Sequence, residues 1–123
     1  MKKAADFLAE ANAVVPNITP EQGIERHSAG ATFVDVRDSG DVAKSGTVAG
    51  ALRITRGMIE FRADEGHALH HADMKKDAEL VLICAAGGQA ALAGKTLVDM
   101  GYSNVSNVGG FEAWKMAGGP VED

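Results

Sequence analysis

The sequence predicts an α/β fold in which α-helices flank both faces of a central parallel β-sheet. Short β-branched and apolar runs at residues 31–36 and 79–84 lack the polar–apolar alternation of half-exposed strands, which indicates burial on both faces. Segments with helical character separate the strand segments, and this alternation favours right-handed crossovers between parallel strands. The length of 123 residues allows one domain with a substantial core. We expect a single domain over residues 1–123, of which residues 1–18 form an N-terminal helical extension.

The N-terminal segment is predicted to form an amphipathic helix over residues 3–14. Pro16 is expected to end this helix, because proline cannot continue the hydrogen-bond ladder. Ile18 is a candidate for the start of a short strand. Four apolar residues fall on one face of the predicted helix: Ala4, Leu8, Ala11 and Val15.

A second helix is expected to begin at Pro20 and to run to about residue 29. Thr19 and Gln22 have the spacing of a capping box, and proline is favoured in the first turn of a helix. Gly30 suits the left-handed position that follows a helix.

The rest of the chain continues the alternation of strands and helices. After the strand at residues 31–36, Asp38 or Ser39 is placed to cap a short helix. Residues 56–77 are the least regular part and are a candidate functional loop. The remaining elements are strands at 48–54, 79–84 and 104–108, a helix over 88–100 closed by Gly101, and a last helix that carries Phe111 and a core Trp114.

Charge, cysteine content and hydropathy exclude several classes of protein. The net charge of −5 and the lack of a basic run argue against a nucleic-acid partner. One cysteine cannot form an internal disulfide. No apolar stretch approaches membrane-spanning length, and Asp6, Glu10 and Asn12 interrupt any signal-type core. We therefore expect a cytoplasmic protein without a membrane partner.

The stretch HALHH at residues 67–71 is a candidate metal site. Metal sites need about four ligands in fixed geometry, and no second cluster of cysteine or histidine accompanies this stretch. We interpret it as a solvated loop, and we interpret His27 as a structural residue of the second helix. The sequence predicts neither a metal nor a cofactor.

The lone cysteine has a distinctive position. Cys84 lies at the end of a buried strand, and a loop of small residues follows it and opens into a helix. Ligands of parallel α/β sheets bind outside the carboxyl ends of the strands. Successive backbone N–H groups and a helix N-terminus can hold an anion there and favour a thiolate. The pattern predicts a nucleophilic thiol in an amide cradle, although a small buried hydrophobic residue is the alternative.

Four stretches carry a resemblance to a known family. In chain order they are FVDVRDSGDV, SGTVAGALRI, ICAAGGQAALAGKTLVDMGYSNV and NVGGFEAWKMAGGPV. Over roughly residues 19–120 they resemble the rhodanese-like (sulfurtransferase) family. The first resembles the Asp-Val-Arg stretch of that family with its following acidic residue, and the second the Gly-His-Ile-x-Gly-Ala segment. The third resembles the active-site loop with its helix, and the fourth the closing Gly-Gly-x-x-x-Trp motif.

The resemblance implies a sulfur carrier. In this family a cysteine takes sulfane sulfur from a donor such as thiosulfate, becomes a persulfide, and passes the sulfur to cyanide, a thiol or a partner protein. Cys84 matches that nucleophile. The resemblance also implies that Asp35 and Arg37 support the sheet end near the loop, with Arg37 paired to Asp41, and a purely structural ion pair is the alternative. The cradle corresponds to the main-chain amides of Ala85, Ala86, Gly87, Gly88, Gln89 and Ala90.

The loop departs from the pattern of the family in its charge. The family often carries arginine five residues after the cysteine, where this chain has Gln89, and serine or threonine next, where it has Ala90. Gln89 brings hydrogen bonds but no charge. Alanine at position 90 also argues against the phosphate-ester hydrolysis of sister phosphatases, which need an arginine there. Arg56 or Arg62 is a candidate for the missing charge.

Three further positions differ from residues that are common in the family: Ala86, Thr47 and Val42. Met58 and Phe61 are candidates for walls of the active-site mouth. The leading prediction is a thiosulfate or persulfide sulfurtransferase with a small-molecule sulfur donor and a thiol or cyanide acceptor, with a partner protein as a further option for sulfur exchange. The alternative is a non-catalytic or regulatory rhodanese-like module that binds a protein or senses oxidants. The intact cysteine favours the enzyme, and the uncharged loop favours the alternative.

Overall fold

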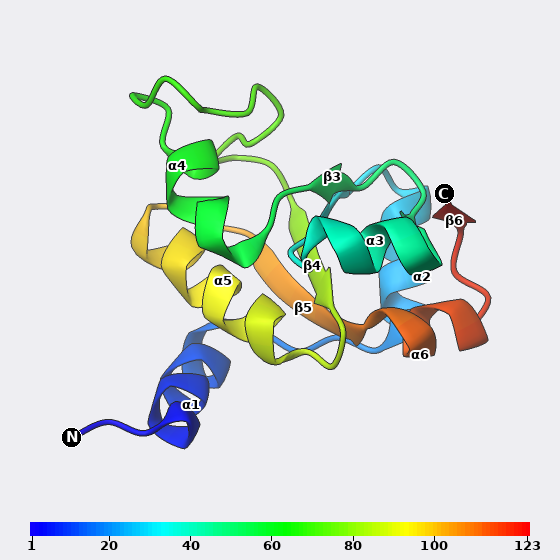
Figure 1. Cartoon of the computed structure of the whole chain (residues 1–123), viewed down its shortest axis with the longest axis horizontal. Coiled ribbons are helices and arrows are strands. Elements are labelled where there is room, and N and C mark those ends of the chain that lie inside the picture. Colours follow the sequence, from blue (N-terminus) through cyan, green and yellow to red (C-terminus); the bar gives the residue numbers. More distant parts are fainter.

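The computed structural model describes all 123 residues and confirms the predicted fold class (Figure 1). A parallel sheet of four strands has the order β3-β1-β4-β5, and β2 and β6 form a separate antiparallel pair. No helix is both long and apolar enough to cross a membrane. The elements are α1 (Ala4–Val14), α2 (Pro20–Ser28), β1 (Thr32–Asp35), α3 (Ser39–Ser45), β2 (Thr47–Val48), β3 (Leu52–Arg53), η1 (Arg56–Met58), α4 (Ile59–Ala63), β4 (Leu80–Cys84), α5 (Gly88–Asp99), β5 (Val105–Gly110), α6 (Phe111–Met116) and β6 (Val121–Glu122).

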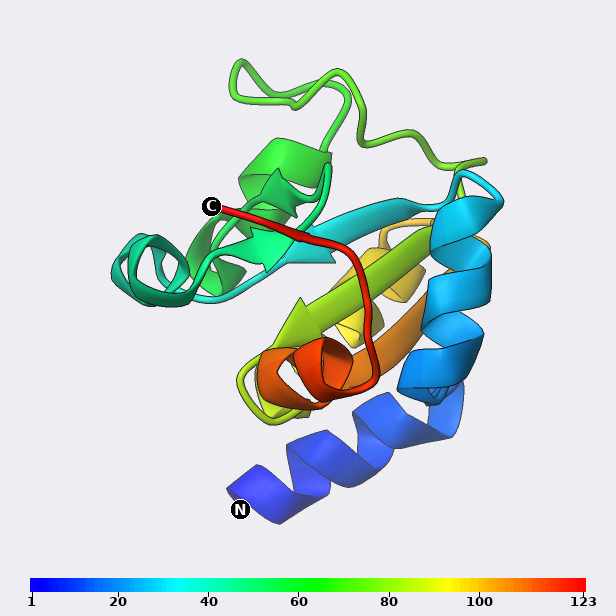
Figure 2. The ribbon, with the colours of Figure 1, turned by 90° about the vertical axis from the view of Figure 1, so that its right-hand side faces the viewer.

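Helices cover both faces of the sheet (Figure 2), and the sheet separates two hydrophobic cores. Side chains of a strand point alternately to opposite faces, so β4 contributes to both cores. Leu80, Leu82 and Cys84 join the larger core, which contains residues of α4 and α5. Val81 and Ile83 join the smaller core with residues of α6. All five residues of β4 are buried, which explains the unbroken apolar run in the sequence.

The expected strand over residues 48–54 is wrong, because two short strands occupy this region. β2 pairs with β6 near the C-terminus, whereas β3 is the edge strand of the main sheet and pairs with β1. Gly50 lies between them with a φ of 78°, and Ala51 N–H donates to the Val48 carbonyl at 3.0 Å. A left-handed residue and a local turn therefore break the run.

The capping box before α2 and the glycines that follow α2 and α5 are confirmed. The Thr19 hydroxyl accepts from Gln22 N–H at 3.1 Å, and the Gln22 side chain accepts from Thr19 N–H at 2.9 Å. Gly30 and Gly101 have φ values of 97° and 99° after α2 and α5. The expected strand at Ile18 is reduced to an isolated parallel bridge between Asn17 and Asn107. Asp38 is the residue before α3, but its side chain makes no capping hydrogen bond.

Trp114 of the smaller core and the half-buried His27 beside it have the structural roles expected of them. Trp114 is fully buried, and its indole N–H donates to the Pro120 carbonyl at 3.0 Å. The Nε2 atom of His27 lies 2.8 Å from the Ala49 carbonyl oxygen. The His27 ring contacts the Phe33 ring edge-on, and the two ring centroids are 5.3 Å apart.

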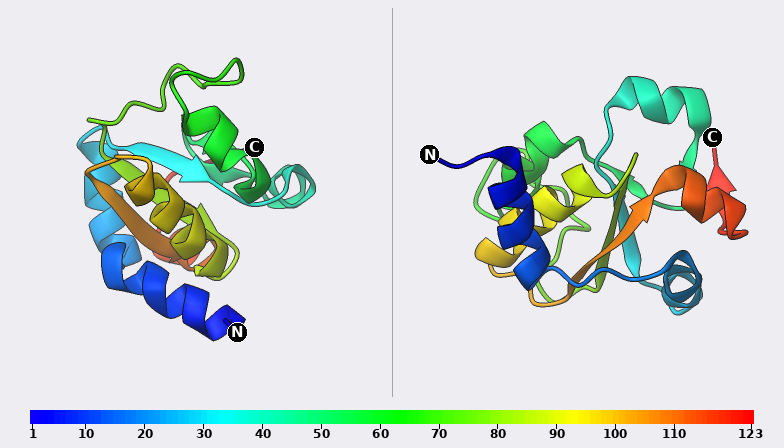
Figure 3. Two further views of the ribbon diagram at one scale, coloured as in Figure 1. Left: turned by 90° about the vertical axis from the view of Figure 1, so that its left-hand side faces the viewer. Right: turned by 90° about the horizontal axis from the view of Figure 1, so that it is seen from below.

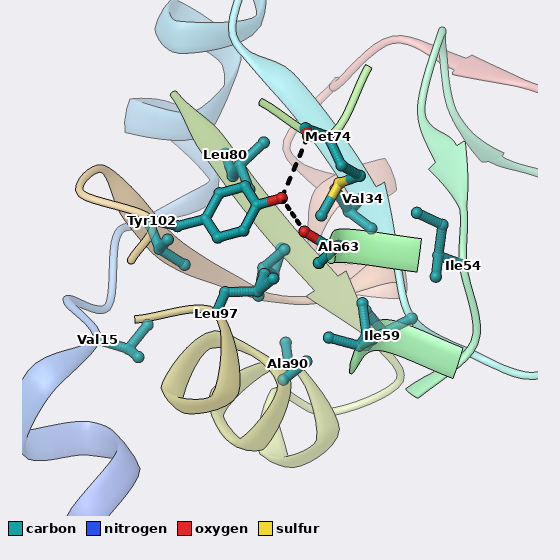
Figure 4. Packing of buried hydrophobic residues seen from close by; sticks show 14 of the residues in the cluster. Val15, Val34, Ile54, Ile59, Ala63, Met74, Leu80, Ala90, Leu97 and Tyr102 are labelled. Atoms are coloured by element: carbon teal, nitrogen blue, oxygen red, sulfur yellow. Dashed lines mark hydrogen bonds between the residues drawn. The ribbon is translucent and has the colours of Figure 1, made fainter. Parts of the chain in front are cut away.

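Tyr102 and Met74 anchor the irregular segment to the larger core (Figure 4). This segment begins with η1 and α4 and continues as a loop. The Tyr102 hydroxyl donates to the Ala63 carbonyl at 2.8 Å and also lies 3.2 Å from the Met74 carbonyl. The histidines of the loop contact nearby backbone: His67 and His71 each accept from the N–H two residues on, and His70 contacts the Met74 carbonyl.

The buried phenol of Tyr102 makes the free energy of unfolding depend on pH in the alkaline range. Burial raises the pKa of Tyr102 above its ordinary value, and the Glu65 and Asp64 carboxylates raise it further. The folded chain therefore holds this proton more tightly than the unfolded chain does. The resulting stabilisation is complete below pH about 10 and is lost as the pH rises through the folded-state pKa.

Since Tyr102 is the only tyrosine, ultraviolet absorbance of tyrosinate reports its titration directly. We expect its midpoint to lie above that of the same chain unfolded in urea. Over the same range, the free energy of unfolding should fall with pH in the wild type and fall less in Tyr102→Phe. Coincident titration curves for the folded and unfolded chains would contradict this prediction.

Candidate functional site

β4 brings Cys84 to the centre of the molecule. The strand lies between β1 and β5, and Cys84 pairs with Gly110 at the carboxyl end of the sheet. Its side chain is 1% exposed and faces the larger core under α5. A sharp turn must follow, because α5 begins at Gly88, only four residues after the cysteine.

The loop from Ala85 to Gly88 wraps its backbone around the sulfur. Gly87 N–H donates to Cys84 Sγ at 2.9 Å, and Ala90 N–H donates to the same atom at 3.4 Å. Gly87 has a φ of 100°, a left-handed conformation that glycine adopts without steric cost. This turn directs amides from both the loop and the first turn of the helix to one point, as in an anion-binding nest.

Four further N–H groups of the loop and of the start of α5 have no acceptor in the protein. The N–H groups of Ala85, Ala86, Gly88 and Gln89 donate to no group of the protein. Ala85, Ala86 and Gln89 are exposed, Gly87 and Gly88 are half-buried, and Ala90 is buried. The N-terminal end of α5 adds its partial positive charge at the same place. The structure therefore brings the predicted cradle residues together beside Cys84, and two of their N–H groups donate to its sulfur.

Two residues of β5 contact the loop and fix its position. A Cβ atom on Gly110 would overlap the Ala85 carbonyl oxygen, so only glycine allows this approach of the two backbones. Asn107 is buried, and its Nδ2 donates to the Gly87 carbonyl at 2.9 Å while its Oδ1 accepts from Gly109 N–H at 2.8 Å. Its backbone also bonds to Pro16 and Ile18.

Asn107 is not among the residues that the sequence indicates as functional. The only local signal was an asparagine before a pair of glycines at the end of a strand. An amide both donates and accepts, so it can satisfy a loop carbonyl and a loop N–H together. Its function in this place depends on the packing of β5 against the loop, which begins twenty residues earlier.

Asp35 and Arg37 form a buried ion pair at the carboxyl end of β1. The Arg37 guanidinium donates to Asp35 Oδ2 at 2.7 Å, and Nε bonds to both carboxylate oxygens. The expected pairing with Asp41 is therefore wrong. Asp41 is exposed on α3, whereas Asp35 presents both oxygens inside the protein, in the bidentate arrangement that suits a guanidinium.

The rest of this network ties β1 to neighbouring elements. Arg37 also donates to the Ser45 hydroxyl and the Gly46 carbonyl, each at 2.8 Å, and stacks over the Phe111 ring of α6 at 4.5 Å. The Thr47 hydroxyl donates to Asp35 at 2.7 Å. Every nitrogen of the Arg37 guanidinium is thus bonded within the protein, and the pair supports the sheet beside the loop.

Of the residues suggested for the active-site mouth, Arg56 alone lines a cavity together with a loop residue. That cavity has a volume of about 640 Å³ and includes Gly88. Arg56 is paired with Glu60 at 3.2 Å and donates to the Thr96 hydroxyl at 3.2 Å. Arg62 and Met58 line a different hollow near Arg53.

Residues 19–117 match the family described as Rhodanese-like domain. The chain belongs to the rhodanese-like domain family. A curated relative, thiosulfate sulfurtransferase GlpE of Pseudomonas entomophila, is 34% identical over 100 residues, which cover 80% of this chain and 83% of that protein. Protein HIGH ARSENIC CONTENT 1, mitochondrial, of Arabidopsis thaliana is 36% identical over 99 residues, which are 74% of this chain but only 56% of that protein.

A solved structure is similar to nearly the full length of this chain. It is a protein of unknown function from Rhodopseudomonas palustris, described as a possible tyrosine phosphatase. The TM-score is 0.92 at 36% identity, and the alignment covers 99% of this chain and 96% of that one. The match therefore includes α1, which precedes the residues matched by the family.

The adjacent loop glycines provide a matched pair of variants. Gly87→Ala places a Cβ in the left-handed region, which costs roughly 1–2 kcal/mol. At Gly88 the backbone is not left-handed, and a Cβ would make ordinary contact with Leu8 Cδ2 at 3.9 Å. In urea unfolding we expect Gly87→Ala to lower the free energy of unfolding by about that amount and Gly88→Ala to be close to neutral. Equal losses in both variants would show that the turn does not require glycine at 87.

Proposed function

We propose that this protein is a sulfurtransferase that carries sulfane sulfur as a persulfide on Cys84. The observation that carries the proposal is the position of Cys84 Sγ, which accepts from Gly87 and Ala90 N–H at the base of a loop with further free amides. The names of the relatives support it, since the chain covers most of the length of a thiosulfate sulfurtransferase.

The proposed reaction is a double displacement. The Cys84 thiolate attacks the outer sulfur of thiosulfate, and a bond forms between Sγ and that sulfur. The S–S bond of thiosulfate breaks, and its electron pair leaves with sulfite. Cyanide or a thiol then attacks the outer sulfur of the persulfide, and the electron pair of the broken bond returns to Sγ as a thiolate.

The cradle favours this chemistry because the charge stays close to the amides throughout. A thiolate, an anionic donor and a departing thiolate are each stabilised by N–H groups that are already oriented and need no reorganisation. We propose Ala85, Ala86, Gly87, Gly88, Gln89 and Ala90 as the residues whose amides bind the transferred group and its donor. Asp35 and Arg37 act as supporting residues, because their bonds hold the neighbouring end of β1.

Phosphatase activity is not part of the proposal. After Cys84 the first basic side chain is Lys95, which lies well inside α5 and is paired with Asp99 at 2.6 Å. A phosphate dianion in this loop would therefore meet amides but no guanidinium from the loop itself.

A regulatory rhodanese-like module is the second candidate. The uncharged Gln89 and the 1% exposure of Cys84 favour it. Such a module would bind a protein or respond to oxidants without turning over a sulfur donor, so persulfide formation separates the two.

Intact mass after incubation with thiosulfate tests the proposed function. The wild type should gain one sulfur, which cyanide removes as thiocyanate. Cys84→Ser should gain none yet unfold in urea at nearly the wild-type midpoint, because backbone and glycines shape the loop. A wild type that gains no sulfur from thiosulfate or polysulfide would favour the regulatory module, and a Cys84→Ser variant that still gains sulfur would remove Cys84 from the mechanism.

The charge of the loop gives a separate prediction. Gln89 is exposed in the first turn of α5, and arginine there would add a charge-assisted contact to dianionic thiosulfate. We expect Gln89→Arg to raise kcat/KM for thiosulfate about ten- to a hundredfold. The gain should shrink at high salt, because exposed charges are screened.

Gln89→Met is the control, because it keeps the length of the side chain and adds no charge. Steady-state rates of the three proteins at low and high salt would decide the matter. If Gln89→Arg does not exceed the control, another cation such as Arg56 already supplies the charge, or thiosulfate is not the donor that suits this loop.

A further inference from the structure

Gly87 permits the turn at the sulfur but does not enforce it. Glycine populates both signs of φ about equally, so the residue alone does not hold a φ of 100°. The Gly87 N–H nevertheless donates to Cys84 Sγ at 2.9 Å. For this bond to persist, neighbouring groups have to fix the other end of the residue, which is the Gly87 carbonyl.

Two donors from different elements meet at the Gly87 carbonyl. Ala91 N–H of α5 donates to it at 3.0 Å, and Asn107 Nδ2 of β5 donates to it at 2.9 Å. A carbonyl oxygen has two lone pairs, and both are used here. A single bond would leave the peptide plane free to rotate about it, whereas two bonds from different directions fix the plane.

The two ends of the Asn107 amide have different tasks. Its Oδ1 accepts from Gly109 N–H at 2.8 Å and so gives that backbone group a partner. Its Nδ2 donates to a carbonyl that Ala91 N–H already satisfies, so hydrogen-bond satisfaction does not require this second bond. Asn107 is only 4% exposed, and burial of an amide costs free energy that an apolar side chain would avoid. The bond from Nδ2 is therefore better explained by the orientation that it gives to the loop.

The backbone of Asn107 is itself held on both sides. β5 pairs with β4 on one side, and the segment that follows α1 runs beside β5 on the other (Figure 3). Asn107 N–H donates to the Pro16 carbonyl, and Ile18 N–H donates to the Asn107 carbonyl, each at 2.9 Å. The side chain therefore extends to the loop from a fixed point of the sheet.

We propose that Asn107 is a positioning residue for sulfur transfer, which holds Gly87 so that its N–H stays directed at Cys84 Sγ. The inference rests on the proposed function and adds a residue to it. When an acceptor attacks the outer sulfur of the persulfide, the bond from Sγ to that sulfur breaks and its electron pair stays on Sγ. An N–H that already points at Sγ stabilises the charge that develops there, whereas a mobile one must first reorient.

Asn107→Asp separates the two ends of the amide. An ionised carboxylate still accepts from Gly109 N–H but cannot donate to the Gly87 carbonyl, whereas a protonated carboxyl does both, as asparagine does. Burial beside a carbonyl raises the pKa of the introduced carboxyl above the ordinary aspartate value of about 3.9. The variant therefore loses the donor as the pH rises and regains it as the pH falls. Asn104→Asp is the matched control, because Asn104 is exposed and lies just before β5.

Single-turnover discharge by sulfite measures the effect. Each protein is loaded with thiosulfate, and cyanide discharge of a sample measures how much persulfide it carries. Excess sulfite then attacks the outer sulfur and leaves with it as thiosulfate, and intact mass follows the loss from mildly acidic to mildly alkaline pH. Urea unfolding at each pH gives the folded fraction, so that each rate refers to folded protein. A merely structural asparagine would change the urea midpoint but not this rate.

We expect Asn107→Asp to discharge about three- to tenfold more slowly than the wild type at alkaline pH, as for one lost hydrogen bond. Its rate should return toward that of the wild type as the pH falls, and Asn104→Asp should match the wild type at each pH. A wild-type rate throughout, or a slower rate that does not recover in acid, would overturn the positioning role and leave the sulfurtransferase proposal intact.

Asn107→Ala covers the case in which Asn107→Asp does not unfold cooperatively. It lacks the donor at every pH, so we expect the same fall in rate without pH dependence. Discharge of Asn107→Ala at the wild-type rate would overturn the positioning role. A wild type that carries no cyanide-labile sulfur would overturn both this role and the proposed function.

Discussion

The left-handed turn at Gly87 is the constraint on which the candidate site depends. The backbone amides of a buried parallel strand normally bond to the neighbouring strands, and β4 follows this pattern up to Cys84. At Gly87 the chain reverses direction, so that one N–H meets the sulfur at 2.9 Å and α5 can begin at the next residue. Without a residue that tolerates a φ of 100°, the amides could not converge on the thiol.

The surrounding fold maintains this turn from three sides. Gly110 of β5 lets the backbone at Ala85 approach closely, and Asn107 fixes the Gly87 carbonyl. On the other side of β4, the Asp35–Arg37 pair joins the end of β1 to β2 and α6. Because removal of one member of a buried pair leaves an unpaired charge, this network makes the geometry of the sheet end hard to change. The surrounding strands and their side-chain network therefore fix the position of the loop, which itself contains only small residues.

The groups around Cys84 act through dipoles rather than formal charges. The loop contributes backbone N–H groups, and the N-terminal end of α5 adds its partial positive charge. In the proposed sulfur transfer, dipoles of this kind stabilise the charge that develops without attracting every dianion in solution. α1 gives the rhodanese-like fold an extra wall at the loop, and the similarity to the Rhodopseudomonas palustris structure over 99% of the chain includes this helix.

The sequence by itself determined the features that depend on neighbouring residues. The apolar run before Cys84, the capping box at Thr19 and the glycines at positions 30 and 101 all have local causes, and the structure contains each of them. The four motifs were also sufficient to place the chain in its family. The role of Cys84 stays a prediction.

Only the tertiary structure decided which distant groups meet. The partner of Arg37 is Asp35 because both are enclosed beside α6, and β2 and β3 belong to different sheets because β6 returns to pair with β2. Asn107 reaches Gly87 across β5, and Leu8 reaches Gly88 from a helix eighty residues earlier in the chain. No local pattern encodes these contacts, since each depends on how whole elements pack and on which polar groups are excluded from water.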